Sequence, residues 1–79
     1  MEIKIIPCLK DNYSYLIFDK NSKVACVIDP GEAKPIIKNL KKLNLKLRYI
    51  LNTHHHFDHV GGNLELKEKF KSEIIGYKN

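Results

Sequence analysis

The sequence contains few cysteines, and this scarcity limits the redox chemistry that the chain can perform. Cys8 and Cys26 are the only two among 79 residues, and they do not form a Cys-x-x-Cys pair. The cysteine-dense framework of small secreted domains is therefore absent. Cys26 lies in an apolar run, residues 24–28, where we expect a small buried hydrophobic side chain, and Cys8 needs no reactive role.

Long apolar runs and a signal-peptide core are also missing. Charged and apolar residues alternate at the N-terminus, and no stretch approaches the roughly 20 apolar residues that span a membrane. We therefore expect a cytoplasmic protein with no membrane partner. With 79 residues the chain is one domain or part of one, and a chain this short buries only about 60% of its unfolded surface.

Arginine is nearly absent, which argues against a nucleic-acid partner. Arg48 stands against 13 lysines, and the net charge of +5 is spread along the chain in runs no longer than Lys41 and Lys42. A nucleic-acid interface clusters its positive charge and includes arginine and stacking aromatic residues. We expect a solvated lysine surface that would not repel an anionic substrate.

The apolar pattern predicts strands and helices in the order βββαβαβ. Strands are expected at residues 2–6, 13–19, 24–29, 47–52 and 74–77, with the first ending at Pro7 and a polar turn at 20–23. Helices are expected at 32–43, with Pro35 in the first turn, and at about 58–71. Apolar residues at helical spacing should pack these helices against the sheet: Ile36, Ile37, Leu40 and Leu43 in the first, and Leu64, Leu66 and Phe70 in the second.

Four side chains that can bind metal fall within six residues: His54, His56, Asp58 and His59. Imidazole and carboxylate are ligands that Zn²⁺ and similar ions choose. The spacing is not the i,i+4 pattern of a zinc-binding helix. An extended segment would instead present His54 and His56 to one side, with His55 pointing away, before a helix that carries the other two. Two pairs of ligands from two directions suit two nearby metal ions, which is the chemistry of metal-assisted hydrolysis.

These residues carry a family resemblance. The His-x-His-x-Asp-His string at 54–59 resembles the metal-binding signature of the metallo-β-lactamase superfamily. Within it the chain is most similar to the glyoxalase II (hydroxyacylglutathione hydrolase) family. That likeness rests on Ile-Pro-Cys-Leu-Lys-Asp-Asn-Tyr-Ser-Tyr at 6–15, Ile-Asp-Pro-Gly at 28–31 and Thr-His-His-His running into Asp-His-Val-Gly-Gly at 53–62.

The resemblance implies an α/β (α+β) fold and half of a metal site. Residues 1–79 would form a partial domain, the N-terminal half of an αββα sandwich, with an exposed sheet face or strand edge that the other half should cover. His54 and His56 would bind one ion, and Asp58 and His59 a second. Zinc is expected, with iron or manganese as alternatives. Further ligands lie downstream in the family, whereas here no His follows His59 and no Asp follows Asp58. Asp29 would accept the other N–H of a ligand histidine and so orient it.

The implied activity is hydrolysis of S-D-lactoylglutathione, a glutathione thioester, to glutathione and D-lactate. A metal-activated water would attack the thioester carbonyl, and no side chain of the chain need act as nucleophile. We expect little activity from this chain alone, and a separate C-terminal half is a candidate partner. The alternative is a non-catalytic metal-binding module or a decayed remnant. Lactam, lactone and phosphodiester hydrolysis stay open as other reactions of the superfamily.

Overall fold

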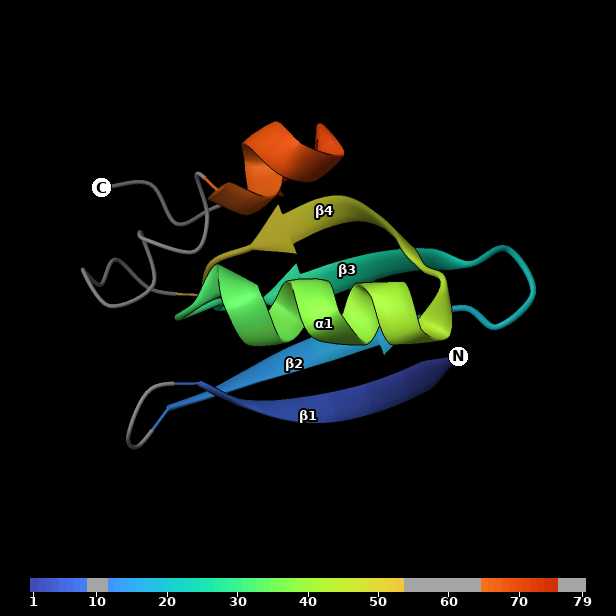
Figure 1. Cartoon of the computed structure of the whole chain (residues 1–79), viewed down its shortest axis with the longest axis horizontal. Helices are drawn as coiled ribbons and strands as arrows, with labels where there is room; N and C mark the ends of the chain where they lie inside the picture. Colours follow the sequence, from blue (N-terminus) through green and yellow to red (C-terminus); the bar gives the residue numbers. More distant parts are fainter. Residues whose placement is uncertain (9–11, 54–64, 76–79) are drawn as a thin grey trace.

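The computed structural model describes residues 1–8, 12–53 and 65–75, which form a mixed five-stranded sheet (Figure 1). The elements are β1 (Glu2–Cys8), β2 (Asn12–Phe18), β3 (Val24–Ile28), α1 (Ala33–Leu43), β4 (Lys46–Leu51) and β5 (Glu73–Ile75), and residues 65–70 are helical. The strands lie side by side in chain order. The first three are antiparallel, and β3, β4 and β5 are parallel. The predicted order βββαβαβ is confirmed.

Helix α1 connects the parallel strands β3 and β4 and lies across one face of the sheet (Figure 1). Its buried side chains are Ala33, Ile36 and Leu40, at the helical spacing expected of an amphipathic helix. The helix ends at Asn44, which adopts a left-handed conformation (φ 56°) and donates its N–H to the carbonyls of Leu40 and Lys41. The four lysines of α1 are not among its buried residues. They lie on the side of the helix that faces solvent, as the pattern predicts.

The hydrophobic core fills the space between this sheet face and the helices. Alternate strand residues point into it, among them Ile6, Leu16, Val27 and Ile50, each at most 2% exposed. From the helical residues 65–70, Leu66 is fully buried and Phe70 packs against the core. These two positions were expected to pack, whereas Leu64 lies outside the described residues.

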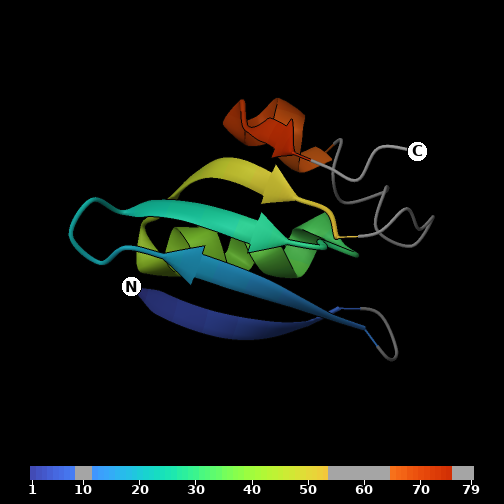
Figure 2. The ribbon, with the colours of Figure 1, turned by 180° about the vertical axis from the view of Figure 1, so that it is seen from behind.

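The opposite face of the sheet is apolar and open to solvent. It carries six large hydrophobic side chains with exposed fractions from 37% to 68%: Ile3, Ile5, Tyr13, Tyr15, Tyr49 and Ile75. We call this set the outer face. Seen from behind, no described helix lies in front of the sheet (Figure 2). The expectation of an exposed sheet face is met over the described residues.

An irregularity in β4 adds to the outer face. Ala25 pairs with Leu47, but the next residue of β3, Cys26, pairs with Tyr49, so Arg48 is an extra residue on β4. A bulge of this kind turns two consecutive side chains toward the same side. Arg48 and Tyr49 are accordingly both exposed, while Ile50 returns to the core.

Two sequence expectations are wrong in detail. Strand β1 does not stop at Pro7, because β1 is an edge strand, where a missing backbone N–H is tolerated, and Pro7 pairs with Tyr13. Cys26 is not a buried core residue. It lies between the buried Ala25 and Val27 and so points to the opposite side of the sheet, half-buried, whereas Cys8 is buried. Burial still raises the pKa of the Cys26 thiol.

No helix among the described residues is long and apolar enough to cross a membrane.

Adjacent isoleucines of α1 give a test of this packing. Ile36 is fully buried, whereas Ile37 is only partly buried against the core. Ile36→Val should lower the free energy of unfolding by about 1 kcal/mol, because a methyl group is lost where neighbours surround it. Ile37→Val should cost less than about half of that. Urea unfolding of both variants measures the difference, and equal losses would contradict the assigned helix orientation.

Candidate metal-loop scaffold

The parallel strands end together, and this shared edge supports the start of the predicted metal-binding segment. Ile28 of β3 pairs with Leu51 of β4, which pairs with Ile75 of β5. The chain stays tied to this edge just past the strands, because Asn52 N donates to Ile75 O over 2.9 Å. The described chain is therefore held at the carboxyl edge of the sheet close to residue 53, where the predicted ligands are about to begin.

Asp29 holds this point through its carboxylate. Its Oδ1 accepts the backbone N–H of Thr53 over 2.8 Å, and its Oδ2 accepts the Thr53 hydroxyl over 2.5 Å. Asp29 is only 8% exposed, so the contact is shielded on the aspartate side. We call this two-bond contact the Asp29–Thr53 clamp. Thr53 directly precedes His54, so the clamp fixes the backbone where the predicted ligands begin.

The backbone of Asp29 has an uncommon conformation. Its φ is 52°, in the left-handed region that non-glycine residues adopt rarely. Aspartate tolerates this region better than most residues because its short polar side chain can hydrogen-bond locally. The main chain is held on both sides: Asp29 N donates to Leu51 O over 2.8 Å, and Asp29 O accepts from the Ser14 hydroxyl over 2.8 Å.

The four predicted metal ligands, His54, His56, Asp58 and His59, lie outside the described residues. Within the described ranges no group of three or more metal-capable side chains gathers. The bond from a ligand histidine to Asp29 therefore stays a prediction. To that expectation the structure adds the contact with Thr53.

Sequence reasoning missed Ser14 and the role of Thr53. Ser14 occupies an inward-facing position of β2, two residues before the core residue Leu16, and it is fully buried. A hydroxyl at a core position of an alternating strand requires a buried hydrogen-bond partner, and this was the available signal. Thr53 had no comparable signal, because it is exposed and its partner is 24 residues away in the chain.

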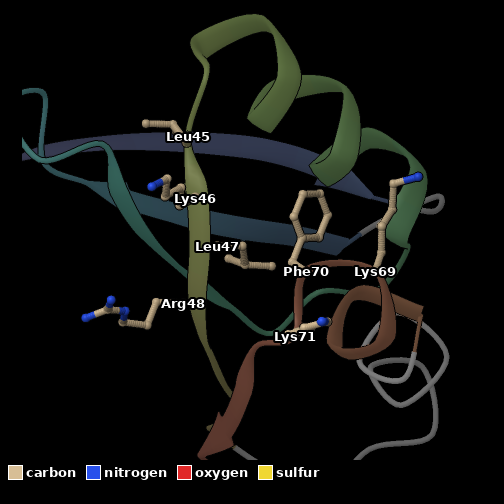
Figure 3. Close-up of a pocket in the computed structure, with 7 residues that line it drawn as sticks. All are labelled: Leu45, Lys46, Leu47, Arg48, Lys69, Phe70 and Lys71. Carbon is tan, nitrogen blue, oxygen red and sulfur yellow. The ribbon is translucent and has the colours of Figure 1, made fainter.

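A separate concave region, lined by neither residue of the clamp, lies beside the amino-terminal part of β4 (Figure 3). It encloses about 460 Å³, and its lining combines apolar and basic residues: Leu45, Leu47, Phe70, Lys46, Arg48, Lys69 and Lys71. In Figure 3, Lys46 and Arg48 point away from Lys69 and Lys71. The cations do not converge on one position, so the groove does not define an anion site.

Comparison with known proteins agrees with this scaffold. The model of the metallo-beta-lactamase superfamily matches residues 10–79. The chain is 69% identical over 78 residues to the hydroxyacylglutathione hydrolase of Pelagibacter ubique, which covers 99% of this chain and 33% of that protein. It is 53% identical over 70 residues to the hydroxyacylglutathione hydrolase of Crocosphaera subtropica, covering 89% of this chain and 27% of the relative. The crystal structure of BLEG-1 B3 metallo-beta-lactamase superposes with a TM-score of 0.84 at 32% identity, over 92% of this chain and 35% of that one.

The fold and the matched residues define a metallo-β-lactamase-type protein, a class that binds divalent metal ions. The chain belongs to the metallo-β-lactamase superfamily, and its similar curated relatives are named hydroxyacylglutathione hydrolase. It spans about one third of the length of those relatives.

The clamp predicts different effects for two substitutions at one position. Thr53→Val removes the hydroxyl that donates to Asp29 Oδ2 and should lower the free energy of unfolding by about 1 kcal/mol. Thr53→Ser keeps the hydroxyl and should stay within about 0.5 kcal/mol of the unaltered chain. Urea unfolding measures both. A loss of the same size in the two variants would mean that the hydroxyl contributes nothing through Asp29.

Proposed function

We propose that this chain contributes part of the metal site of a glyoxalase II-like hydrolase that cleaves S-D-lactoylglutathione to glutathione and D-lactate. The observation that carries the proposal is the Asp29–Thr53 clamp, which fixes the chain at the residue before the His-rich stretch. The names of the similar relatives support the substrate class.

The donor set fits zinc. Three imidazoles and one carboxylate at His54, His56, Asp58 and His59 are ligands that zinc accepts, although iron and manganese accept them too. His54 and His56 would hold one ion, and Asp58 and His59 a second. When bound, such ions supply an activated water and polarise the thioester carbonyl. The chain's own contribution is to hold the ligands in place, with the clamp anchoring the first of them.

A matched pair of histidines tests the metal site. His54→Ala together with His56→Ala should abolish binding of one of the two zinc ions, because both of its proposed ligands in this chain are lost. His55→Ala should leave the zinc affinity within about twofold, since alternation along an extended chain turns residue 55 away from its neighbours. Competition with a chromophoric chelator gives the affinity, and circular dichroism confirms that each variant keeps its fold. Equal zinc binding by all three proteins would refute the assignment of the ligands.

We further propose that the outer face packs against a polypeptide equivalent to the other two thirds of the relatives, joined to this chain or separate. Six large apolar side chains at 37–68% exposure form a patch of the kind that marks an interaction site. Similar proteins are about three times longer, so their additional residues are the occupant that this family offers. The same partner would supply the remaining metal ligands and the substrate pocket.

This pairing is tested by adding, as a separate polypeptide, the part of the Pelagibacter ubique relative that this chain does not match. Thioesterase turnover should appear only in the mixture, and Cys26 should be alkylated at least about tenfold more slowly there, because it would be covered. Cys26 is a suitable reporter because it pairs with Ile17 and Tyr49 on this side of the sheet. Its raised pKa requires alkylation at alkaline pH.

Two variants control the pairing experiment. Tyr15→Lys places a charge in the middle of the outer face and should prevent both effects, whereas Lys38→Glu, on the solvent side of α1, should prevent neither. Complex formation without turnover would favour a metal-binding module over an enzyme. If Cys26 reacts equally fast with and without the second polypeptide, the proposed interface is wrong.

A further inference from the structure

Ser14 stands at the centre of a buried polar group that lies outside the predicted metal ligands. Its hydroxyl donates to Asp29 O over 2.8 Å and accepts the Gly31 N–H over 3.4 Å. The thiol of Cys8 lies 3.2 Å from the same oxygen. A hydroxyl has one proton, and it is used on Asp29, so the thiol of Cys8 donates to Ser14. The group thus links β1 and β2 to the turn after β3.

These bonds matter because they hold the backbone of Asp29 in its left-handed conformation. A left-handed conformation is unfavourable for a residue other than glycine and persists where its surroundings hold it. At Asp29 the preceding peptide is held by Leu51 O and the following peptide by the Ser14 hydroxyl. With both peptides fixed, the Cα–Cβ bond of Asp29 has one direction, and this direction aims the carboxylate at Thr53.

We propose that Ser14 is a positioning residue for the metal-binding segment. It acts through the backbone of Asp29, whose carboxylate in turn fixes Thr53, the residue before His54. The proposal rests on the proposed function in so far as that segment binds metal. Groups that orient ligands from outside the coordination shell typically change metal affinity by about 10–100-fold when removed.

The simpler reading is that Ser14 fills space and satisfies its own hydroxyl, and a second serine tests that reading. Ser72 is also buried, 4% exposed, and its hydroxyl also donates to a backbone carbonyl, that of Leu47, over 2.7 Å. It lies beside β4 and donates to neither Asp29 nor Thr53. Ser14 and Ser72 are therefore matched in burial and in bond type. They differ in the backbone carbonyl that accepts the bond, which belongs to Asp29 for Ser14 and to Leu47 for Ser72.

The experiment compares Ser14→Ala with Ser72→Ala in the 79-residue chain. Ser14→Ala should weaken zinc binding by about tenfold in a chelator competition assay, and Ser72→Ala by less than about twofold. Hydrogen exchange of the Thr53 and Asp29 amides gives a readout without metal. Both amides should exchange about tenfold faster in Ser14→Ala, relative to the core amides of Val27 and Ile50. If Ser14→Ala fails to fold, Ser14→Cys, with similar volume and a weaker donor, takes its place and should show smaller changes of the same sign.

The outcomes separate this inference from the proposed function. Unchanged zinc affinity and unchanged Thr53 exchange in a folded Ser14→Ala variant would overturn the role of Ser14 and leave the metal site intact. Equal effects of Ser14→Ala and Ser72→Ala would overturn it as well, since they would reflect general destabilisation. If zinc binding is the same with and without His54 and His56, the proposed function fails, and the exchange of the Thr53 amide decides the role of Ser14 by itself. The same exchange decides that role if the chain binds no zinc in the absence of the second polypeptide.

Discussion

The conformation of Asp29 is the constraint on which the edge of the sheet depends. All four hydrogen-bonding atoms of Asp29 are engaged. Its N–H donates to Leu51 O, its carbonyl accepts from the Ser14 hydroxyl, and its two carboxylate oxygens accept from Thr53. One residue thereby joins β2, β3 and the end of β4. A left-handed aspartate is unfavourable alone, so its presence at 8% exposure indicates that the surrounding strands determine it. The predicted metal-binding segment begins directly after this arrangement, at residue 54.

Only one face of the sheet is covered by helices in the described residues. One face is covered by α1 and the helical residues 65–70, which bury Ile36, Leu40 and Leu66. The other presents tyrosine and isoleucine side chains at exposures that soluble surfaces seldom gather in one patch. A sheet with apolar residues on both sides belongs between two layers. In the described residues only one layer is present, which is consistent with a chain that spans one third of its relatives.

Much of the fold could be predicted from the sequence, and the site only in outline. Alternation in β1 to β3 and helical spacing in α1 are local patterns, so the element order and the packing of Ile36 and Leu40 were recoverable. The extra residue at Arg48 and the continuation of β1 through Pro7 depend on neighbouring strands, which a single segment does not encode. The clamp was missed for the same reason. Thr53 and Asp29 carry no shared local signal, whereas the histidine cluster is contiguous and therefore visible.

The sheet topology also leads to an expectation about the order in which the chain folds. The hairpin of β2 and β3 closes over a short turn, but Asp29 reaches Thr53 only across 24 residues, after α1 has crossed and β4 has paired with β3. Parallel pairing of this kind requires loop-closure entropy to be overcome before any contact forms, and it is intrinsically slow. We therefore expect the contact before His54 to form late in folding, so that the geometry at this edge follows the fold and does not nucleate it.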